Sequence, residues 1–364
     1  MENYETTNKA YDVQGHNLWH VFSRHIDRSG AQTALCHVFN NLLTSSDSDD
    51  ISVLTPLSLS AAFDTIDHDL LQKCLRDVFG IHDTALAFFG SYLSGRKQIV
   101  FVLGRQSSVL SPILFILYTQ PPSDIIEGHS VLQHMFADDT ELYNSAHHSS
   151  ADSLFCNMQN CVSDVKKWTI HNKLQLNENK TEALLFDPSK FSNFPDVLRI
   201  GLSDIPFCYS ARNLGVLFDS GLTMKQQVDR ICQTACFEIR RMGSVCHFLT
   251  TEATKILATS LVLSCLEYCS SQLAGIPQKL LNKVQHVINC AARLVCKAPQ
   301  REHVTPLLVD LRWLPVECRI ECKIATTRSV VLLLIISLMS SNYIPHHALS
   351  APLLTLHLPY SEQM

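Results

Sequence analysis

The sequence lacks an apolar run long enough to cross a membrane. Its longest run spans residues 330–336 and reaches barely a dozen residues with its neighbours, whereas a transmembrane helix needs about 20. We therefore expect a buried helix in this region. The first residues, Met1–Thr6, are polar and acidic, so no secretory signal is visible. Together these absences favour an intracellular protein, in the nucleus or the cytoplasm, that is soluble or depends on a partner.

The sequence also lacks the ligand spacing of a structural zinc site. It holds 14 cysteines, but it has no Cys-x-x-Cys pair and no histidine at the sequence spacing from such a pair that a zinc site requires. An intracellular protein keeps its thiols reduced, so we interpret the cysteines as small buried hydrophobic residues. Three pairs are spaced four residues apart and would lie on one helix face: Cys232/Cys236, Cys265/Cys269 and Cys318/Cys322.

The chain as a whole has no excess of positive charge, because its formal net charge is -5. The distribution is uneven, because residues 221–330 hold 14 Lys and Arg against 8 Asp and Glu. That part carries +6 and the remainder therefore -11. A basic part beside an acidic one fits a phosphate-facing module next to a metal-binding module. It fits ordinary helix surfaces equally well, so both interpretations stay open.

The composition and the apolar periodicity predict a globular chain with mixed secondary structure. It has 364 residues, 46% of them hydrophobic and 17% charged, which suits two or three packed units. The pattern mixes helices and strands up to about residue 220 and is helical beyond. Predicted strands cover 51–59, 98–103, 181–186, 197–200, 206–209 and 213–217, and predicted helices 33–44, 67–80, 84–93, 108–118, 153–172, 224–246, 251–268, 277–297 and 316–339.

Two adjacent carboxylates, Asp138 and Asp139, stand between short apolar segments of strand-like spacing. Like charges at the tip of a hairpin repel each other, and a bound divalent cation relieves that repulsion. Mg²⁺ suits such a pair because it binds one or two carboxylates together with substrate phosphates. Taken alone, an Asp-Asp pair fits a solvated turn better, so its interpretation depends on the rest of the chain.

Three segments in order extend this motif. Residues 59–68 read Leu-Ser-Ala-Ala-Phe-Asp-Thr-Ile-Asp-His, residues 106–115 begin Gln-Ser-Ser, and residues 136–140 read Phe-Ala-Asp-Asp-Thr. In these segments the chain resembles the reverse transcriptase of non-LTR (LINE-type) retrotransposons. The resemblance covers most of residues 30–320 and continues at Trp168, 172–182, 213–216, 291–295 and 312–315.

The resemblance implies an α+β right-hand polymerase. Its palm, a four-stranded sheet backed by helices, would carry only partial fingers and would precede an all-helical thumb and a C-terminal helical region. We assign residues 1–30 to a poorly defined N-terminal segment and 31–220 to partial fingers and palm. Residues 221–315 would form the helical thumb-like region, and residues 316–364 a C-terminal helical segment and tail.

The resemblance also implies catalytic roles. Asp138 and Asp139 match the palm's metal-binding pair, which would hold two Mg²⁺ ions for in-line phosphoryl transfer. Lys180 matches a palm lysine that could protonate or stabilise the pyrophosphate. The implied partners are an RNA template, a DNA primer and dNTP, with no membrane. A further partner could supply missing fingers or an endonuclease.

The resemblance places further residues around the substrates. Phe63 matches the aromatic ring under the incoming sugar, and Gln106 and Ser107 fall in the segment that lines the template and nucleotide pocket. Residues 213–216 resemble the primer-grip hairpin, and the basic region after Gly221 takes the place of the thumb. Phe63 could instead be a core ring, and Gln106 and Lys180 surface residues. The order of the motifs favours the inherited positions.

The chain departs from the family pattern at the first motif. Ser58 stands where the family has the aspartate that opens Asp-Leu-Ser-Ala-Ala-Phe-Asp. That carboxylate normally bridges both metals, and a neutral hydroxyl cannot balance their charge. Asp64 lies six residues further on, beyond Phe63, and is not expected to replace it. Pro56 is a second departure, since proline is unwelcome in a central strand.

The second motif departs as well. Ser107 replaces the glycine of Pro-Gln-Gly-Ser, which lets the backbone approach the substrate closely. The stretch from Gln98 to Gln106 is short for the family, little of the fingers precedes residue 30, and no endonuclease segment is visible. We therefore expect a degenerate copy with weak or no activity. An active RNA-directed DNA polymerase, a non-catalytic nucleic-acid-binding remnant and a relic without a selected role all stay open.

Overall fold

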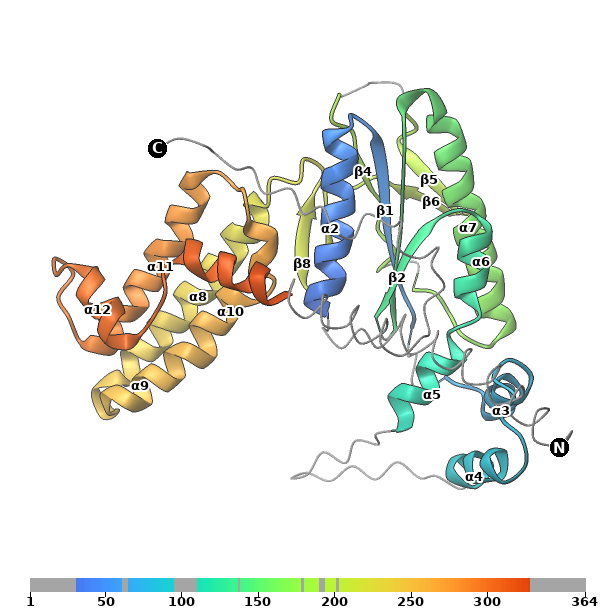
Figure 1. The fold of residues 1–364 in the computed structure, drawn as a ribbon, viewed down its shortest axis with the longest axis horizontal. Coiled ribbons are helices and arrows are strands. Elements are labelled where there is room, and N and C mark those ends of the chain that lie inside the picture. The colour runs from blue at the N-terminus through green and yellow to red at the C-terminus, as the bar shows by residue number, and fades with distance from the viewer. Residues whose placement is uncertain are drawn as a thin grey trace, which may run out of the picture. The chain divides into compact units, whose positions relative to one another are not determined.

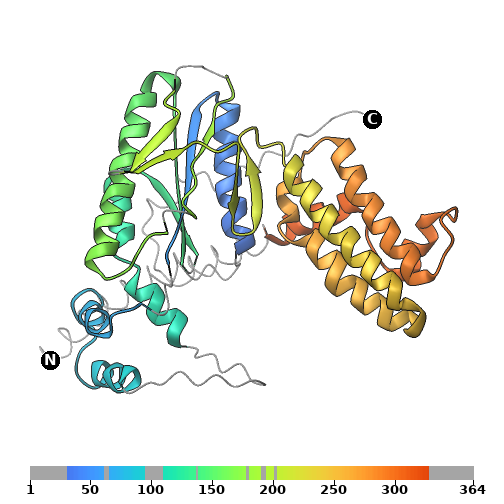
Figure 2. The same ribbon diagram turned by 180° about the vertical axis from the view of Figure 1, so that it is seen from behind.

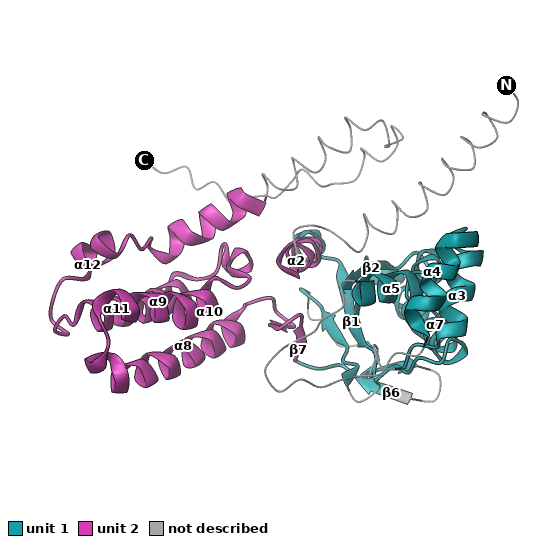
Figure 3. Ribbon diagram, turned by 90° about the horizontal axis from the view of Figure 1, so that it is seen from below, with its two compact units in different colours: residues 1–30, 44–209 teal, residues 31–43, 210–364 magenta. Residues whose placement is uncertain are grey.

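The fold is described from a computed structural model, which places residues 31–60, 65–94, 110–136, 138–177, 180–189, 194–200 and 203–327. These residues fall into two compact units (Figure 3). The first unit holds residues 44–209, and the second holds residues 31–43 together with the chain from Ser210 onward. The predicted domain boundaries near residues 30, 220 and 315 stay predictions.

A four-stranded antiparallel sheet forms the centre of the first unit (Figure 1). Its strands lie in the order β2-β3-β1-β4. They are β1 (Ile51–Ser58), β2 (Leu132–Phe136), β3 (Asp139–Ala146) and β4 (Leu184–Phe186). The long pairing of β1 with β3 runs from Ile51 opposite Ala146 to Ser58 opposite Asp139. The two motifs that are 80 residues apart in sequence therefore meet at one end of the sheet.

One face of the sheet is buried under helices. Alternate residues of β1, such as Val53 and Leu57, share a core with Leu142 of β3 and with Met158 and Val162 of α7 (Ala151–His171). The helix presents apolar residues at every third or fourth position, and this apolar stripe faces the sheet. The helix α6 (Pro122–Gly128) lies beside it on the same core (Figure 2).

A second, smaller core joins three helices to Leu59, which follows β1, and to Leu174. These are α3 (His68–Asp77), α4 (Asp83–Leu93) and α5 (Leu110–Tyr118). Asp67 caps α3, because its side chain accepts hydrogen bonds from the backbone N–H groups of Asp69 and Leu70. The remaining elements of this unit are η1 (His148–Ser150) and a two-stranded pair of β5 (Val197–Ile200) and β6 (Ser203–Pro206).

Pro56 fits β1 in spite of the expectation that it would disturb a central strand. The Ser58 carbonyl accepts a hydrogen bond from Asn177 N at 2.8 Å, so even-numbered residues at this end turn their backbone away from β3. On that side β4 pairs only with residues 52–54. The missing N–H of Pro56 therefore points to a place where β1 has no neighbouring strand to bond.

The second unit combines a β-hairpin with a helical array. Its hairpin is formed by β7 (Ser210–Asn213) and β8 (Val216–Asp219). Residues 31–43 contribute the first part of α2 (Ala31–Asp47), whose Phe39 ring stacks on Phe218 with a centroid distance of 5.7 Å. The helical elements that follow are α8 (Lys225–Val245), η3 (Cys246–Phe248), α9 (Thr251–Ala258), η4 (Thr259–Leu263), α10 (Ser264–Glu267), η5 (Ser270–Leu273), α11 (Gln278–Cys296), α12 (Val304–Leu311) and 316–327.

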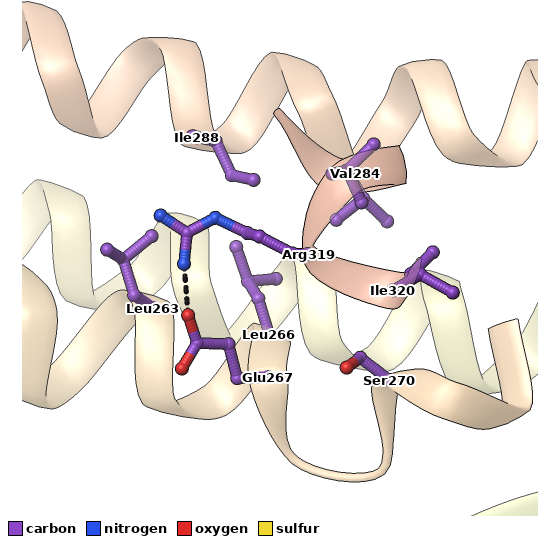
Figure 4. Close-up of a pocket in the computed structure, with 9 residues that line it drawn as sticks. Leu263, Leu266, Glu267, Ser270, Val284, Ile288, Arg319 and Ile320 are labelled. Carbon is purple, nitrogen blue, oxygen red and sulfur yellow. Dashed lines mark hydrogen bonds and ion pairs between the residues drawn. The ribbon is translucent and has the colours of Figure 1, made fainter. Parts of the chain in front are cut away.

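The last helix is tied to α10 across a small apolar pocket. Figure 4 shows the Arg319 guanidinium reaching the Glu267 carboxylate between the side chains of Leu263 and Ile288. The Arg319 side chain is 14% exposed and that of Glu267 is 47% exposed, so water reaches this ion pair from the glutamate side. Arg319 Nε also donates to the Leu314 carbonyl at 2.7 Å, which fixes the turn before the helix.

Several expected elements differ from the structure. The strand predicted at 206–209 is wrong in its bounds, because β6 covers Ser203–Pro206. The strand predicted at 213–217 is divided between two strands, because the chain turns at Leu214 and Gly215, whose φ angles are 41° and 85°. The helix predicted at 251–268 is interrupted by the π-helical turn η4. The helices α6 and α12 were not expected; Pro121 and Pro122 end α5 but also start α6, since proline suits a first helical turn. The segments 98–103 and 330–336 lie outside the described residues.

None of the described helices combines the length and the apolar character that crossing a bilayer requires. All fourteen cysteines lie in the described ranges as free thiols.

The buried side of the sheet gives a stability prediction. Leu142 of β3 is fully buried, whereas Leu132 of the edge strand β2 is 50% exposed. Leu142→Ala should lower the free energy of unfolding by about 2–5 kcal/mol, because a buried methyl-rich side chain leaves a cavity behind. Leu132→Ala is the matched control and should cost less than about 1 kcal/mol. Urea unfolding followed by far-UV circular dichroism measures both, and equal losses would contradict the assigned core.

Candidate catalytic site on the β1–β3 strand pair

Ser58 and Asp139 lie directly opposite each other at the end of the sheet. They form a non-hydrogen-bonded pair of the ladder, since the Ser58 carbonyl bonds to Asn177 while Leu59 N donates to the Asp138 carbonyl at 3.4 Å. Side chains of such pairs approach most closely in antiparallel sheets. The position that lacks a carboxylate in the first motif is therefore in contact distance of the acidic motif.

The electrostatics of Asp139 reflect this crowding. Burial raises the pKa of its carboxyl above the usual value, and the negative charge of Asp138 raises it further. A hydrogen bond with the Ser58 hydroxyl and the positive charge of Lys180 act in the opposite direction. The hydroxyl thus helps to hold Asp139 ionised, but it adds no negative charge of its own.

Lys180 reaches this neighbourhood through a turn anchored on β1. Asn177 N donates to the Ser58 carbonyl at 2.8 Å, and the Asn177 carbonyl accepts from Lys180 N and Thr181 N at 3.0 and 3.1 Å. Lys180 is exposed. The sequence analysis assigned Lys180 from the family resemblance, but it did not predict that the turn before Lys180 bonds to Ser58. The polar residues that follow Leu176 predicted the turn itself.

The other predicted substrate residues cannot be placed. Phe63, Gln106 and Ser107 lie outside the described residues, as does Asp64. One acidic residue that the sequence analysis overlooked is Glu141, which is buried and shares the Asp139 face two residues along β3, opposite Pro56. The alternation of side chains along a strand could have indicated it.

A comparison with protein families decides the assignment. Residues 4–229, more than half of the chain, match the family described as reverse transcriptase (RNA-dependent DNA polymerase). The chain belongs to the reverse transcriptase family. This confirms the expected fold class, a mixed helix-and-sheet polymerase palm followed by a helical region. A comparison with curated proteins finds no match.

Solved telomerases from two Candida species are structurally similar to this reverse transcriptase. The C. tropicalis enzyme truncated from the C-terminal domain is 14% identical, with 59% of this chain and 44% of that chain covered and a TM-score of 0.37. The C. albicans enzyme with a fragment of telomeric RNA is 13% identical, with 84% of this chain and 57% of that chain covered and a TM-score of 0.35. Apo C. tropicalis telomerase is 10% identical, with 88% of this chain and 58% of that chain covered and a TM-score of 0.36. The chain spans about half the length of these proteins. Likenesses this distant add nothing to the family assignment.

Magnesium is the metal that the reverse transcriptase family implies, and the site fits it in part. Asp138 and Asp139 supply hard carboxylate oxygens, of which Mg²⁺ needs one or two beside substrate phosphates. Within the described ranges no three His, Cys, Asp or Glu side chains group as metal ligands. Asp138 and Asp139 are therefore the residues that would hold a cation, with the Ser58 hydroxyl beside them, and position 58 supplies no carboxylate.

The raised pKa of Asp139 gives a stability prediction for the metal-free chain. Because the native state binds this proton more tightly than the unfolded chain does, the ionised carboxylate destabilises the native state once the pH exceeds its folded pKa. Asp139→Asn should therefore raise the thermal unfolding temperature at pH 7, and the gain should shrink as the pH falls toward about 4, the unfolded value.

The exposed Asp196, in the same unit, is the control, and Asp196→Asn should change little. Scanning calorimetry in the presence of a chelator measures the effect. A lower unfolding temperature for Asp139→Asn at pH 7 would show that the carboxylate stabilises the free protein.

Proposed function

We propose that this chain is the RNA-directed DNA polymerase of a non-LTR (LINE-type) retrotransposon in a degenerate form, with weak or no activity. The observation that carries the proposal is the direct pairing of Ser58 with Asp139. A neutral hydroxyl at this position leaves two carboxylates where the family pattern has three. The LINE-type assignment rests on the ordered motifs at 59–68, 106–115 and 136–140.

The proposed substrates are an RNA template, a DNA primer and dNTP. Asp138 and Asp139 would hold the catalytic metal, and Lys180 would stabilise the leaving pyrophosphate. The chemistry that bound Mg²⁺ supplies in such enzymes is activation of the primer hydroxyl and neutralisation of the triphosphate. Phe63 would lie under the incoming sugar, and Gln106 and Ser107 would line the template and nucleotide pocket. The proposed location is the nucleus or the cytoplasm.

Charge balance explains why Ser58 matters more than its size suggests. Serine and aspartate are close in volume, and Ser58 already faces Asp139. In the free protein burial raises the pKa of Asp139, and the negative charge of Asp138 raises it further. A third carboxylate would increase this repulsion and would become favourable only with divalent cations bound.

Ser58→Asp is therefore the decisive variant. It should raise the affinity for Mg²⁺ by more than about tenfold, since even outer-shell partners of metal ligands are worth about 10–100-fold. It should also increase primer extension on an RNA template. Isothermal titration with Mg²⁺ and a primer-extension assay measure the two effects.

Two controls accompany this variant. Ser91→Asp adds the same charge on the exposed side of α4 and should change neither readout. Asp139→Asn in the Ser58→Asp background should abolish the gain. Robust processive synthesis by the unaltered chain would overturn the degeneracy, and no gain from Ser58→Asp would overturn the role of position 58.

A second candidate function is a non-catalytic nucleic-acid-binding protein. The observation in its favour is the charge of residues 221–330, which is +6 in a chain of net charge -5. Much of that charge lies on the exposed surface of the helical array, for example at Arg240 and Arg241 of α8 and at Lys279 of α11. Phosphate contacts by such residues hold a duplex without reading its sequence.

Salt dependence tests this candidate. Binding of an RNA–DNA duplex should weaken with salt with a slope of about -0.9 for each phosphate contact, and Arg240→Ala should reduce the slope by about one. Arg199→Ala removes a charge that pairs with Asp204 in the first unit, and it should leave the slope unchanged. Fluorescence anisotropy over a salt series measures both. A slope near zero would exclude this function.

A further inference from the structure

The tip of the β7–β8 hairpin is held in an unusual backbone conformation. Asn213 pairs with Val216, so only Leu214 and Gly215 form the turn, and both have positive φ angles of 41° and 85°. Two-residue turns of this kind favour Asn-Gly, because both residues must adopt left-handed conformations. Leucine is a poor residue there. A strained backbone conformation of this kind persists only where contacts with the surrounding structure enforce it.

Three side chains from the helical array bond backbone groups of this turn and of the strand that follows it. The Tyr268 hydroxyl donates to the Leu214 carbonyl at 2.6 Å, and Arg230 Nη1 donates to the Gly215 carbonyl at 3.2 Å. Gln227 Oε1 accepts from Leu217 N at 3.0 Å. Gln227 and Arg230 belong to α8, and Tyr268 follows α10 directly. The turn is thus bonded to two separate helices.

The Tyr268 ring packs beside the turn. A Cβ at position 215 would make an ordinary van der Waals contact with Tyr268 Cε1 at 3.5 Å, so it is the φ of 85° that disfavours a side chain there. Burial raises the pKa of the Tyr268 hydroxyl to about 12, so it stays a hydrogen-bond donor at any physiological pH. The next residue back is Glu267, which Arg319 of the last helix fixes through its ion pair (Figure 4).

The base of the hairpin is anchored as firmly as its tip. The buried Asp219 carboxylate accepts hydrogen bonds from Gly221 N at 3.2 Å and from Thr223 N at 2.9 Å. It also accepts one from the Thr223 hydroxyl at 3.1 Å, which fixes the chain between β8 and α8. Hydrogen bonds therefore fix the segment 219–223, which connects the hairpin to α8.

We propose that Tyr268 and Arg230 are positioning residues that lock the Leu214–Gly215 turn onto the helical array, so that turn and α8 contact the primer strand as one rigid element. This rests on the proposed function and on the resemblance of residues 213–216 to the primer-grip hairpin. Phosphoryl transfer tolerates little misplacement of the primer hydroxyl. A turn that contacts the primer must therefore be held by hydrogen bonds from the protein, as Tyr268 and Arg230 hold this one. A guanidinium has five donors, so Arg230 can bond the Gly215 carbonyl and a primer phosphate together.

Tyr268→Phe tests the lock, because it removes one hydroxyl and keeps the ring. In the full chain, amide hydrogen exchange in the peptide covering 213–219 should accelerate about two- to tenfold, the equivalent of one ordinary hydrogen bond. Tyr118→Phe is the matched control, since the Tyr118 hydroxyl donates to the Asn172 carbonyl at 2.7 Å in the first unit. It should leave exchange in 213–219 unchanged.

The primer role needs a second readout. A recessed RNA–DNA duplex carries 2-aminopurine either at the primer 3′ terminus or about six base pairs upstream. Tyr268→Phe should change the fluorescence of the terminal probe on binding and leave that of the upstream probe as in the unaltered chain. A variant that merely loses stability would move both probes together. Arg230→Lys, which keeps the charge but loses the fork geometry, should behave like Tyr268→Phe and replaces it if the latter fails to fold.

The outcomes separate the lock from the proposed function. Unchanged exchange in 213–219 for both variants would overturn the lock. Faster exchange with an unchanged terminal probe would overturn the positioning role. If the unaltered chain binds blunt and recessed duplexes equally, the proposed function fails at primer holding, and the exchange result still decides the lock.

Discussion

The register between β1 and β3 is the constraint on which the candidate site depends. A slip of one residue would turn every side chain of β1 to the other face of the sheet and would move Ser58 away from Asp139. The register is set by the buried face, where Val53 and Leu57 must meet Leu142 and the apolar stripe of α7. Packing on one side of the sheet thus decides which chemistry is possible on the other.

The site illustrates how a functional arrangement works against stability. Asp138 and Asp139 sit close together, and burial makes the charge of Asp139 more costly. The Ser58 hydroxyl and Lys180 offset part of that cost in the free protein. A carboxylate at position 58 would remove this relief and would be favourable only in the presence of metal. Serine at this position leaves Asp138 and Asp139 as the carboxylates of the two paired motifs.

The second unit shows the same principle in its backbone. Leu214 occupies a conformation that a leucine rarely adopts, and bonds from Tyr268, Arg230 and Gln227 hold the turn there. Gln227, Arg230 and Tyr268 follow the residues that they bond by 10, 15 and 54 positions along the chain. The hairpin gains its shape from helices that lie later in the sequence.

The sequence by itself determined the family, the order of the motifs and most element types. Apolar periodicity is local, so the helices at 33–44, 153–172 and 277–297 and the strand at 51–59 could be predicted within a few residues. It also showed that position 58 lacks a carboxylate. It failed at 206–217, where the conformation of Leu214 depends on distant hydrogen bonds that no local pattern encodes.

Only the tertiary structure decided what those residues face. The pairing of Ser58 with Asp139 joins positions 81 residues apart, and the tolerance of Pro56 depends on where β4 ends. Both follow from strand pairing, which is a property of two segments together. A pattern read along one segment reports which side chains are buried, and the partner that each one meets is fixed only when the whole sheet and its covering helices pack.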